Sequence, residues 1–265
     1  MKIWDIVTKN SCFYVENDEN GKKTIVLNNP DEISCEYNDI DVSCLYAQKL
    51  ISKRERIDGN FSVAFNRLKR LESFPRIVEG SFDCSFNKLD TLEGSPEEVG
   101  GDFICTHNKI VSLEGISERI GGSVYIFKNH LKSLKGIQKR VNGNFDCSYN
   151  SLKTLEGGPK YVEGDYDCSG NNIKNLKGLP KYVGGDFICI HNTRNLSEDE
   201  IKKRVEVKGR IILSKKIKED INWYRREDIS EKSRKVATIA ISKAFEMFFN
   251  NANKNENLII KRREK

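Results

Sequence analysis

Seven asparagines recur along this chain at a constant interval of 21 residues: Asn66, Asn87, Asn108, Asn129, Asn150, Asn171 and Asn192. A fixed period of this length is the signature of a solenoid, in which each repeat forms one coil and neighbouring coils stack. The period argues against a globular domain built around one central core. It constrains the shape of the protein much more strongly than its function.

The residues around each asparagine also recur, and their types predict one strand per coil. Glycine stands seven positions before the asparagine, a large apolar residue five before, and Cys, Val or Ile three before, as in Gly101, Phe103 and Cys105. Apolar residues at alternate positions indicate a short, half-buried strand. Leucine or isoleucine follows two and five positions after the asparagine in the first six repeats, with a break at Arg194 in the seventh. A single coil cannot bury these side chains without its neighbours.

The rest of each coil is expected to be irregular or to contain a short 3₁₀ turn. Proline resists helix interiors, and four prolines share one column of the repeat: Pro75, Pro96, Pro159 and Pro180. The repeated asparagine is expected to hydrogen-bond backbone groups of its own turn and of the neighbouring coil, because stacking would otherwise bury those groups without partners.

This pattern resembles the leucine-rich repeat family. Residues 103–113 match the family's core L-x-L-x-x-N-x-L, with Phe and Cys in the first two leucine places, and the resemblance covers residues 57–196. It implies an α/β-type, mostly β solenoid: a right-handed leucine-rich-repeat coil with a parallel sheet on its concave side. The short form seen in residues 143–159 is similar to arrays of bacterial and bacteriophage proteins.

An N-terminal β cap is expected over residues 1–37. There, Cys12–Val15 and Thr24–Leu27 flank an Asn-Gly pair, which indicates a β-hairpin, although the connection is long for a tight turn. Residues 38–196 are expected to form the solenoid, with one degenerate repeat before the seven regular ones. In the degenerate repeat, Leu45 stands in the place of the asparagine.

A basic, helical C-terminal cap with one strand is expected over residues 197–265. Ser197–Glu200 has the pattern of a capping box at the start of a short helix. Ile211–Leu213 is a candidate last strand, and residues 230–250 carry an apolar stripe at helical spacing. That stripe indicates a cap on the last coil or, alternatively, a helix through which the protein forms a homo-oligomer.

The charge is uneven along the chain. Residues 201–265 contain 19 Lys and Arg against 9 Asp and Glu, whereas the first 200 residues contain 26 against 30. The basic C-terminal region therefore leaves nucleic-acid binding open as an alternative function. The chain has no apolar run long enough to span a membrane, and because its first residues lack an apolar h-region we expect no secretory signal. The expected location is cytoplasmic, in a bacterial or phage-infected host cell.

Cysteine is interpreted as a packing residue. Five cysteines occupy the inward column three positions before the asparagine, where Val63 and Ile126 stand in other repeats. A position that accepts cysteine, valine and isoleucine needs a small apolar side chain, and a cytosolic protein rarely keeps disulfides. These five are Cys84, Cys105, Cys147, Cys168 and Cys189.

The candidate binding residues lie at outward-facing positions of the predicted strands and beside the repeated asparagines. They are Phe65, Phe86, His107, Tyr125, Phe127, Lys128, His130, Tyr149, Asp146, Asp167, Ile188 and His191. Exposed aromatic and histidine side chains are typical of an interaction surface, although isolated apolar residues also occur on ordinary surfaces.

An acidic corner is expected at one end of this surface. It consists of Asp146, Asp165, Asp167 and Asp186. Clustered carboxylates of this kind are interpreted as a solvated rim that meets a basic partner. A site for a divalent cation is the alternative.

No motif for catalysis or for a cofactor occurs in the chain. It lacks a Walker loop, an H-E-x-x-H segment and a G-x-G-x-x-G turn that enters a helix. We therefore expect a non-enzymatic protein without a cofactor, which binds a protein partner on its concave face. The resemblance to bacterial and phage arrays favours an inhibitor or adaptor of a host protein, an inference by analogy.

Overall fold

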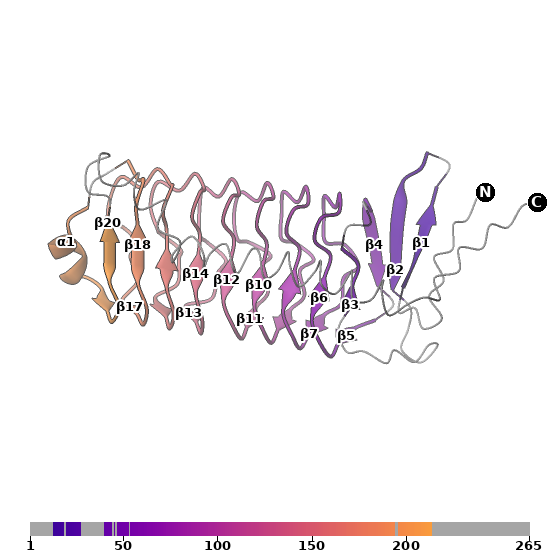
Figure 1. Ribbon diagram of the computed structural model, residues 1–265, viewed down its shortest axis with the longest axis horizontal. Helices are drawn as coiled ribbons and strands as arrows, with labels where there is room; N and C mark the ends of the chain where they lie inside the picture. The colour runs from indigo at the N-terminus through magenta and orange to yellow at the C-terminus, as the bar shows by residue number, and fades with distance from the viewer. Residues whose placement is uncertain are drawn as a thin grey trace, which may run out of the picture.

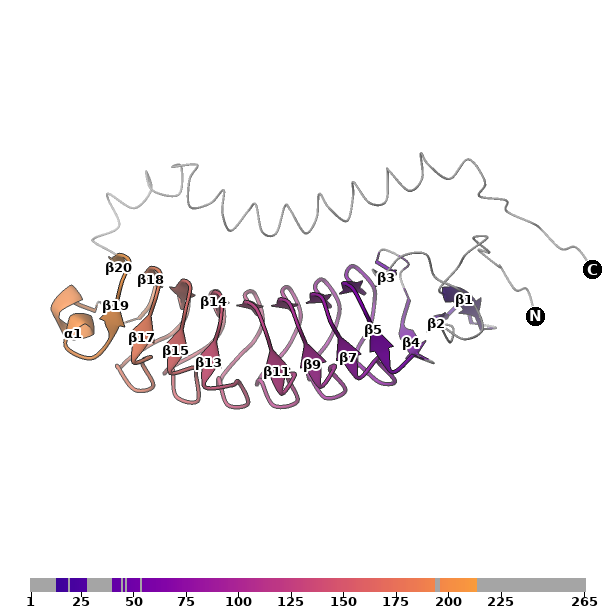
Figure 2. The ribbon, with the colours of Figure 1, turned by 90° about the horizontal axis from the view of Figure 1, so that it is seen from below.

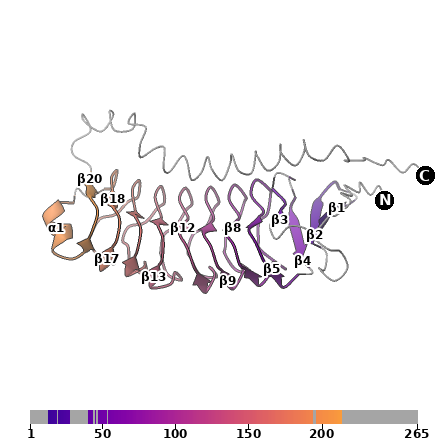
Figure 3. The ribbon, with the colours of Figure 1, turned by 60° about the horizontal axis from the view of Figure 1, so that its bottom comes forward.

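The computed structural model describes residues 13–18, 20–27, 40–43, 45, 47–52, 54–193 and 196–213. These residues form an elongated stack of coils (Figure 1), which bends gently along its length (Figure 2). Each regular coil contributes two short strands on opposite sides of the stack (Figure 3). The described part of the chain is therefore a mostly β, parallel solenoid, in agreement with the period of the sequence.

One side of the solenoid is a parallel sheet of nine strands, ordered β20-β18-β16-β14-β12-β10-β8-β6-β3. Phe82 lies opposite Phe61 on one side and Phe103 on the other, so equivalent residues of successive repeats are neighbours in space. This sheet lies on the inner side of the bend and is called the concave face below (Figure 2). Its strands are β3 (Ile40–Asp41), β6 (Phe61–Ser62), β8 (Phe82–Asp83), β10 (Phe103–Ile104), β12 (Val124–Tyr125), β14 (Phe145–Asp146), β16 (Tyr166–Asp167), β18 (Phe187–Cys189) and β20 (Ile211–Leu213).

The opposite side carries two parallel sheets of four strands each. The return leg is thus more regular than expected, because each coil places an apolar residue such as Val78 inward and pairs its backbone with the coil before it. The N–H of Glu79, for example, donates to the carbonyl of Ile57 at 2.9 Å. The strands are β5 (Arg56–Ile57), β7 (Ile77–Val78), β9 (Glu98–Val99) and β11 (Arg119–Ile120), then β13 (Arg140–Val141), β15 (Tyr161–Val162), β17 (Tyr182–Val183) and β19 (Glu206–Val207).

The N-terminal end carries the predicted hairpin. Strands β1 (Phe13–Asn17) and β2 (Lys23–Leu27) pair antiparallel, and β2 continues in parallel to β4 (Lys49–Ser52). The degenerate repeat takes its expected place, because β3 pairs with β6 in the same register as the regular coils.

The C-terminal end of the described chain also follows its sequence signals. Helix α1 (Glu198–Lys202) begins with a complete capping box between Ser197 and Glu200, as predicted. Strand β20 pairs with β18 as the last strand of the concave sheet. Residues 214–265 lie outside the described residues, and with them the predicted helix over 230–250 and most of the basic C-terminal region.

The core runs along the axis of the solenoid and is built from the inward columns. The five cysteines that the sequence assigned to packing are buried free thiols, none more than 5 % exposed. They lie among fully buried leucines and aromatic rings, such as Leu134 and Phe145. The inward side chains of each coil pack against those of the coils before and after it, so no single repeat could bury this set of side chains alone.

The repeated asparagines form an internal ladder that joins the coils. The Nδ2 group of Asn129 donates to the carbonyls of Cys105 in the preceding coil (2.7 Å) and of Ile126 in its own turn (3.2 Å). Its Oδ1 accepts the N–H of Ile110 in the preceding coil at 3.1 Å. The expected role of the asparagine is confirmed: it pairs backbone groups that stacking removes from water.

Candidate functional site

The residue before each ladder asparagine has a left-handed backbone. Its φ lies between 51° and 54° in six coils and reaches 63° in the seventh, where the residue is Gly170. Left-handed φ is uncommon for bulky residues and costs on the order of 1 kcal/mol or more at each position. The six side chains that carry this strain are Phe65, Phe86, His107, Lys128, Tyr149 and His191.

Four rings of this region form a continuous row of contacts along the solenoid, which we call the aromatic ladder. The centroids of Phe65 and Phe86 lie 4.3 Å apart with the rings 8° from parallel, and those of Phe86 and His107 lie 4.1 Å apart at 13°. Phe127 then meets His107 edge to face at 5.6 Å. All four are half-buried. Because strands lie about 4.8 Å apart, rings held in register on successive coils fall naturally at stacking distance.

Beyond this ladder, Tyr149 and Lys128 are exposed. The side chain of Tyr149 is among the most exposed large hydrophobic groups of the described chain, at 39 %. A Cβ atom on Gly170 would lie 2.8 Å from the Tyr149 ring, so the ring leans over the glycine of the next coil. His130 and His191 are also exposed, at the margin of the same face.

His107 is held close to neutral at pH 7. Burial lowers the pKa of the His107 imidazole, and the positive charge of Lys128 lowers it further. Its Nδ1 lies 3.2 Å from Oγ1 of Thr106. A neutral imidazole stacked on Phe86 behaves as a flat, largely apolar ring, which fits its place in the aromatic ladder.

A column of aspartates runs beside the ladder on the concave face. Asp146 and Asp167 are register partners on adjacent strands, and Asp83 lies in the same column. The Oδ1 atoms of Asp146 and Asp167 accept the N–H groups of Ser148 (2.9 Å) and Ser169 (2.8 Å). Each carboxyl group therefore accepts a hydrogen bond from the backbone two residues further along its own chain segment.

Burial changes the protonation of these aspartates. It raises the pKa of Asp83 to about 6. Burial, and then the negative charge of Asp167, raise the pKa of Asp146 to about 7. The pKa of Asp167 is raised as well, chiefly by burial. At neutral pH this column carries less negative charge than its sequence indicates.

Two of the expected binding residues contribute little surface. Tyr125 and Ile188 stand at outward positions of their strands, yet each is only 8 % exposed. In the parallel register, Tyr125 is flanked by Ile104 and Asp146, and such neighbours on both sides cover much of an outward side chain. These two side chains are therefore less accessible than their outward positions indicate, and their contact with a partner stays a prediction.

The acidic corner is not an open cluster of carboxylates. Asp165 accepts the N–H of Asp186 at 2.7 Å, and Asp186 accepts the N–H of Arg210 at 2.7 Å and forms an ion pair with its guanidinium at 2.7 Å. Among the described residues, no group of three or more His, Cys, Asp or Glu side chains is placed to hold a metal ion. The cation alternative gains no support from this part of the chain.

Asp165 and Asp186 belong instead to a second side-chain ladder that sequence reasoning missed. Six positions before each ladder asparagine, a short side chain accepts the N–H of the equivalent residue in the next coil, at distances between 2.6 and 3.0 Å. The sequence could have predicted this ladder, because every residue of the column is Asn, Ser or Asp and so has a short side chain with an oxygen that can accept a hydrogen bond. The column is Asn60, Ser81, Asp102, Ser123, Asn144, Asp165 and Asp186.

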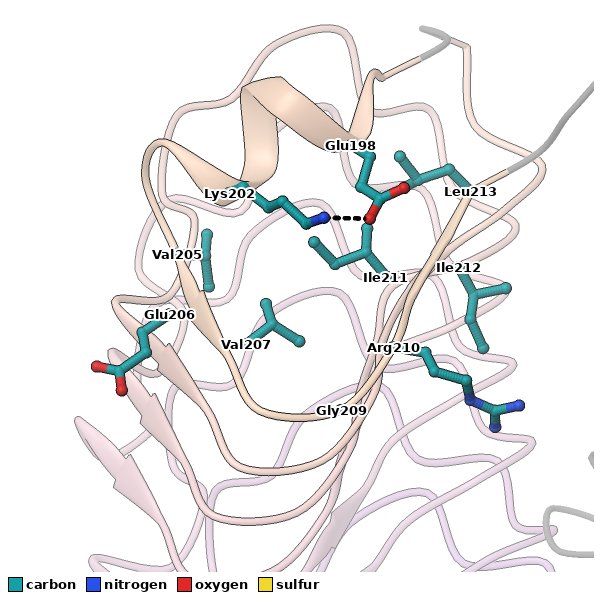
Figure 4. Close-up of a pocket in the computed structure, with 10 residues that line it drawn as sticks. All are labelled: Glu198, Lys202, Val205, Glu206, Val207, Gly209, Arg210, Ile211, Ile212 and Leu213. Atoms are coloured by element: carbon teal, nitrogen blue, oxygen red, sulfur yellow. Dashed lines mark ion pairs between the residues drawn. The ribbon is translucent and has the colours of Figure 1, made fainter.

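A pocket of about 760 Å³ lies at the last described coil (Figure 4), and no residue of the aromatic ladder lines it. Apolar side chains such as Val207 and Ile211 point into it, and an ion pair between Glu198 and Lys202 at 2.6 Å crosses one side. Arg210 points away from the pocket (Figure 4). The pocket thus has a mixed lining of apolar and charged side chains, and among the described residues that line it there is no Ser, Thr, Cys or His that could act as a nucleophile.

The fold and this surface together define a class: a parallel β-solenoid repeat protein with an aromatic and acidic concave face. Comparisons with family models, with curated proteins and with solved structures found no match. The helix within the described residues, α1, is far too short to cross a bilayer.

Proposed function

We propose that this protein is a non-enzymatic binding module that recognises a protein partner on its concave face. The observation that carries the proposal is the left-handed column before the ladder asparagines. Glycine adopts this backbone without strain, as at Gly170, yet six of the seven coils place a large side chain there. Large residues that are kept in a strained backbone conformation, at a cost in folding stability, are candidates for a functional role.

The geometry of the column suits protein recognition. The rings of the aromatic ladder contact one another and are half-buried, while Tyr149 is exposed. Because the hydrogen-bonded coils already hold these side chains in place, a partner would lose little conformational entropy in ordering them. Tyrosine and other aromatic residues also dominate the energetics of many protein interfaces.

The finer assignment is part of the same proposal. We assign the solenoid to the leucine-rich repeat class on the strength of its sequence columns. We place it in the cytoplasm of a bacterial or phage-infected cell, as an inhibitor or adaptor of a host protein, with residues 230–250 as a helical cap. These steps are supported by the resemblance and by sequence signals.

The test is a comparison of two double variants in a capture experiment. Immobilised full-length protein is incubated with nuclease-treated lysate, and bound proteins are quantified by mass spectrometry. Lys128→Ala combined with Tyr149→Ala should abolish capture of the specific partner. Lys181→Ala combined with Tyr182→Ala makes the same chemical change on the opposite side and should leave capture intact. Equal capture by both variants would remove the concave face as the binding surface.

A further inference from the structure

The turn edge of the solenoid, beside the aromatic ladder, carries a surplus of positive charge. We define the basic flank by three columns: the residue before each ladder asparagine, the residue after it, and the residue three after it. In these columns Asp90 is the single carboxylate between Phe65 and Thr193. The basic members are all exposed; they are Arg67, Lys69, Lys88, Lys109, Lys128, Lys132, Lys153 and Lys174.

Several of these lysines are neighbours on adjacent coils. The N–H of Lys174 donates to the carbonyl of Lys153 at 3.1 Å, and Lys132 occupies the same column one coil earlier. Lys88 and Lys109 likewise occupy one column of adjacent coils. Like charges at equivalent positions of neighbouring strands repel and lower stability.

Within the described part of the chain, these five lysines make no ion pair with a carboxylate. The opposite side of the solenoid carries both signs of charge. Cations there are matched to carboxylates of neighbouring coils: Arg56 with Glu79, Arg76 with Glu97, Arg119 with Glu98, and Arg140 with Glu163. The column of Lys139, Lys160 and Lys181 on that side also makes no ion pair with a carboxylate among the described residues, so the basic flank is set apart by its scarcity of carboxylates.

The basic flank also borders the aromatic ladder directly. Lys88 and Lys109 follow the asparagines that come just after Phe86 and His107, and Lys128 lies in the same column as Tyr149. A line of lysines with aromatic side chains alongside is the arrangement by which proteins hold single-stranded nucleic acid: cations track the phosphates and rings contact the bases. An acidic peptide would neutralise the lysines but would have no bases to contact the rings, so the surface fits a single-stranded nucleic acid better.

We propose that the basic flank binds single-stranded nucleic acid. The phosphates run along the stacked lysines, and bases rest against Tyr149 and the aromatic ladder. This site lies on the solenoid, whereas the sequence alone pointed to the basic C-terminal region.

The experiment measures fluorescence anisotropy of a labelled oligothymidylate of about 20 nucleotides, a length sufficient for the site sizes seen in such proteins, with full-length protein at low and physiological salt. Wild-type protein should bind at low salt and weaken as salt rises. Lys132→Gln, Lys153→Gln and Lys174→Gln together should weaken binding at least about tenfold. They should also lower the salt slope by about 2, because each phosphate contact on a single strand contributes about 0.7.

A matched triple variant separates this site from general attraction. Lys139→Gln, Lys160→Gln and Lys181→Gln remove the same charge from three adjacent coils on the opposite side, and affinity should stay within about twofold because these lysines make no phosphate contact. Circular dichroism melts confirm that both variants fold. Absence of binding at low salt, equal weakening in both triple variants, or equally tight binding of labelled polyglutamate would each overturn the proposal. The two proposals share Tyr149 and the aromatic ladder, and the nuclease step in the capture experiment keeps their tests separate.

Discussion

Removing one rung of the asparagine ladder is the most direct test of how the coils are held together. Asn129 is 5 % exposed, and its amide serves two backbone groups of the preceding coil. Asn129→Ala leaves the N–H of Ile110 and the carbonyl of Cys105 buried without partners. Each such group costs about 1–3 kcal/mol, and the small void left by the amide adds to that. The expected loss of unfolding free energy is about 3–6 kcal/mol.

A matched variant in the second ladder shows whether burial sets this cost. The Oδ1 atom of Asn144 also accepts one backbone N–H, that of Asp165 at 2.8 Å, but this side chain is only half-buried. Water can replace the lost acceptor there, so Asn144→Ala should cost only about 0.5–1.5 kcal/mol. Both variants are compared with wild-type protein in urea titrations followed by circular dichroism, with the shift of the midpoint as the measured quantity.

A third variant at the same position tests the chemistry of the rung. Asn129→Asp keeps the acceptor oxygen but replaces the donor amide with a carboxylate in a buried site. Burial raises the pKa of such a group, and only its protonated form can donate to the Cys105 carbonyl. The variant should therefore be strongly destabilised at pH 8 and partly rescued at pH 4. A loss for Asn129→Ala no larger than that for Asn144→Ala would refute the ladder as the main tie between coils.

Three further perturbations test the same architecture. Leu134→Ala empties a fully buried position and should cost about 2–5 kcal/mol in urea titrations. Gly115 has a φ of 83°, and Gly115→Ala places a methyl group 2.6 Å from the backbone nitrogen of Glu93. Gly21 has a similar φ of 71°, but a methyl group there would meet no atom within 4 Å. Thermal melts should therefore show a far larger drop in Tm for Gly115→Ala than for Gly21→Ala. Asp146 has a folded pKa of about 7, above its unfolded value, so its contribution to stability is present at pH 4 and is lost as pH rises through 7. Asp146→Asn should accordingly raise the Tm at pH 8 and flatten the decline in Tm between pH 4 and 8; an unchanged pH profile would contradict this.

The period of the sequence predicted the parts of the fold that depend on repetition. Stacking in register follows from the constant spacing of the asparagines, and it dictates which side chains are inward, as the buried cysteine column confirms. Short sequence motifs predicted the structure at the two ends of the solenoid, because the capping box at Ser197 and the hairpin around Gly21 each depend on only a few residues.

Three features escaped prediction for physical reasons. Strands of two residues, such as β7, are too short to show alternation of apolar and polar residues. The left-handed column was hidden because Phe65 and its equivalents are large, whereas such a backbone is usually signalled by glycine, present only at Gly170. The burial of Tyr125 depends on which residues occupy its column in the coils before and after, a consequence of the three-dimensional register.

The two side-chain ladders have a consequence for the evolution and engineering of this molecule. The rungs of both ladders join each coil to the next at fixed positions of the repeat, so excision or duplication of one complete 21-residue unit, such as residues 109–129, brings equivalent donors and acceptors together at the new junction. An insertion of any other length would leave one coil out of phase with the next. The length of the exposed aromatic and basic surface can therefore change only by whole coils.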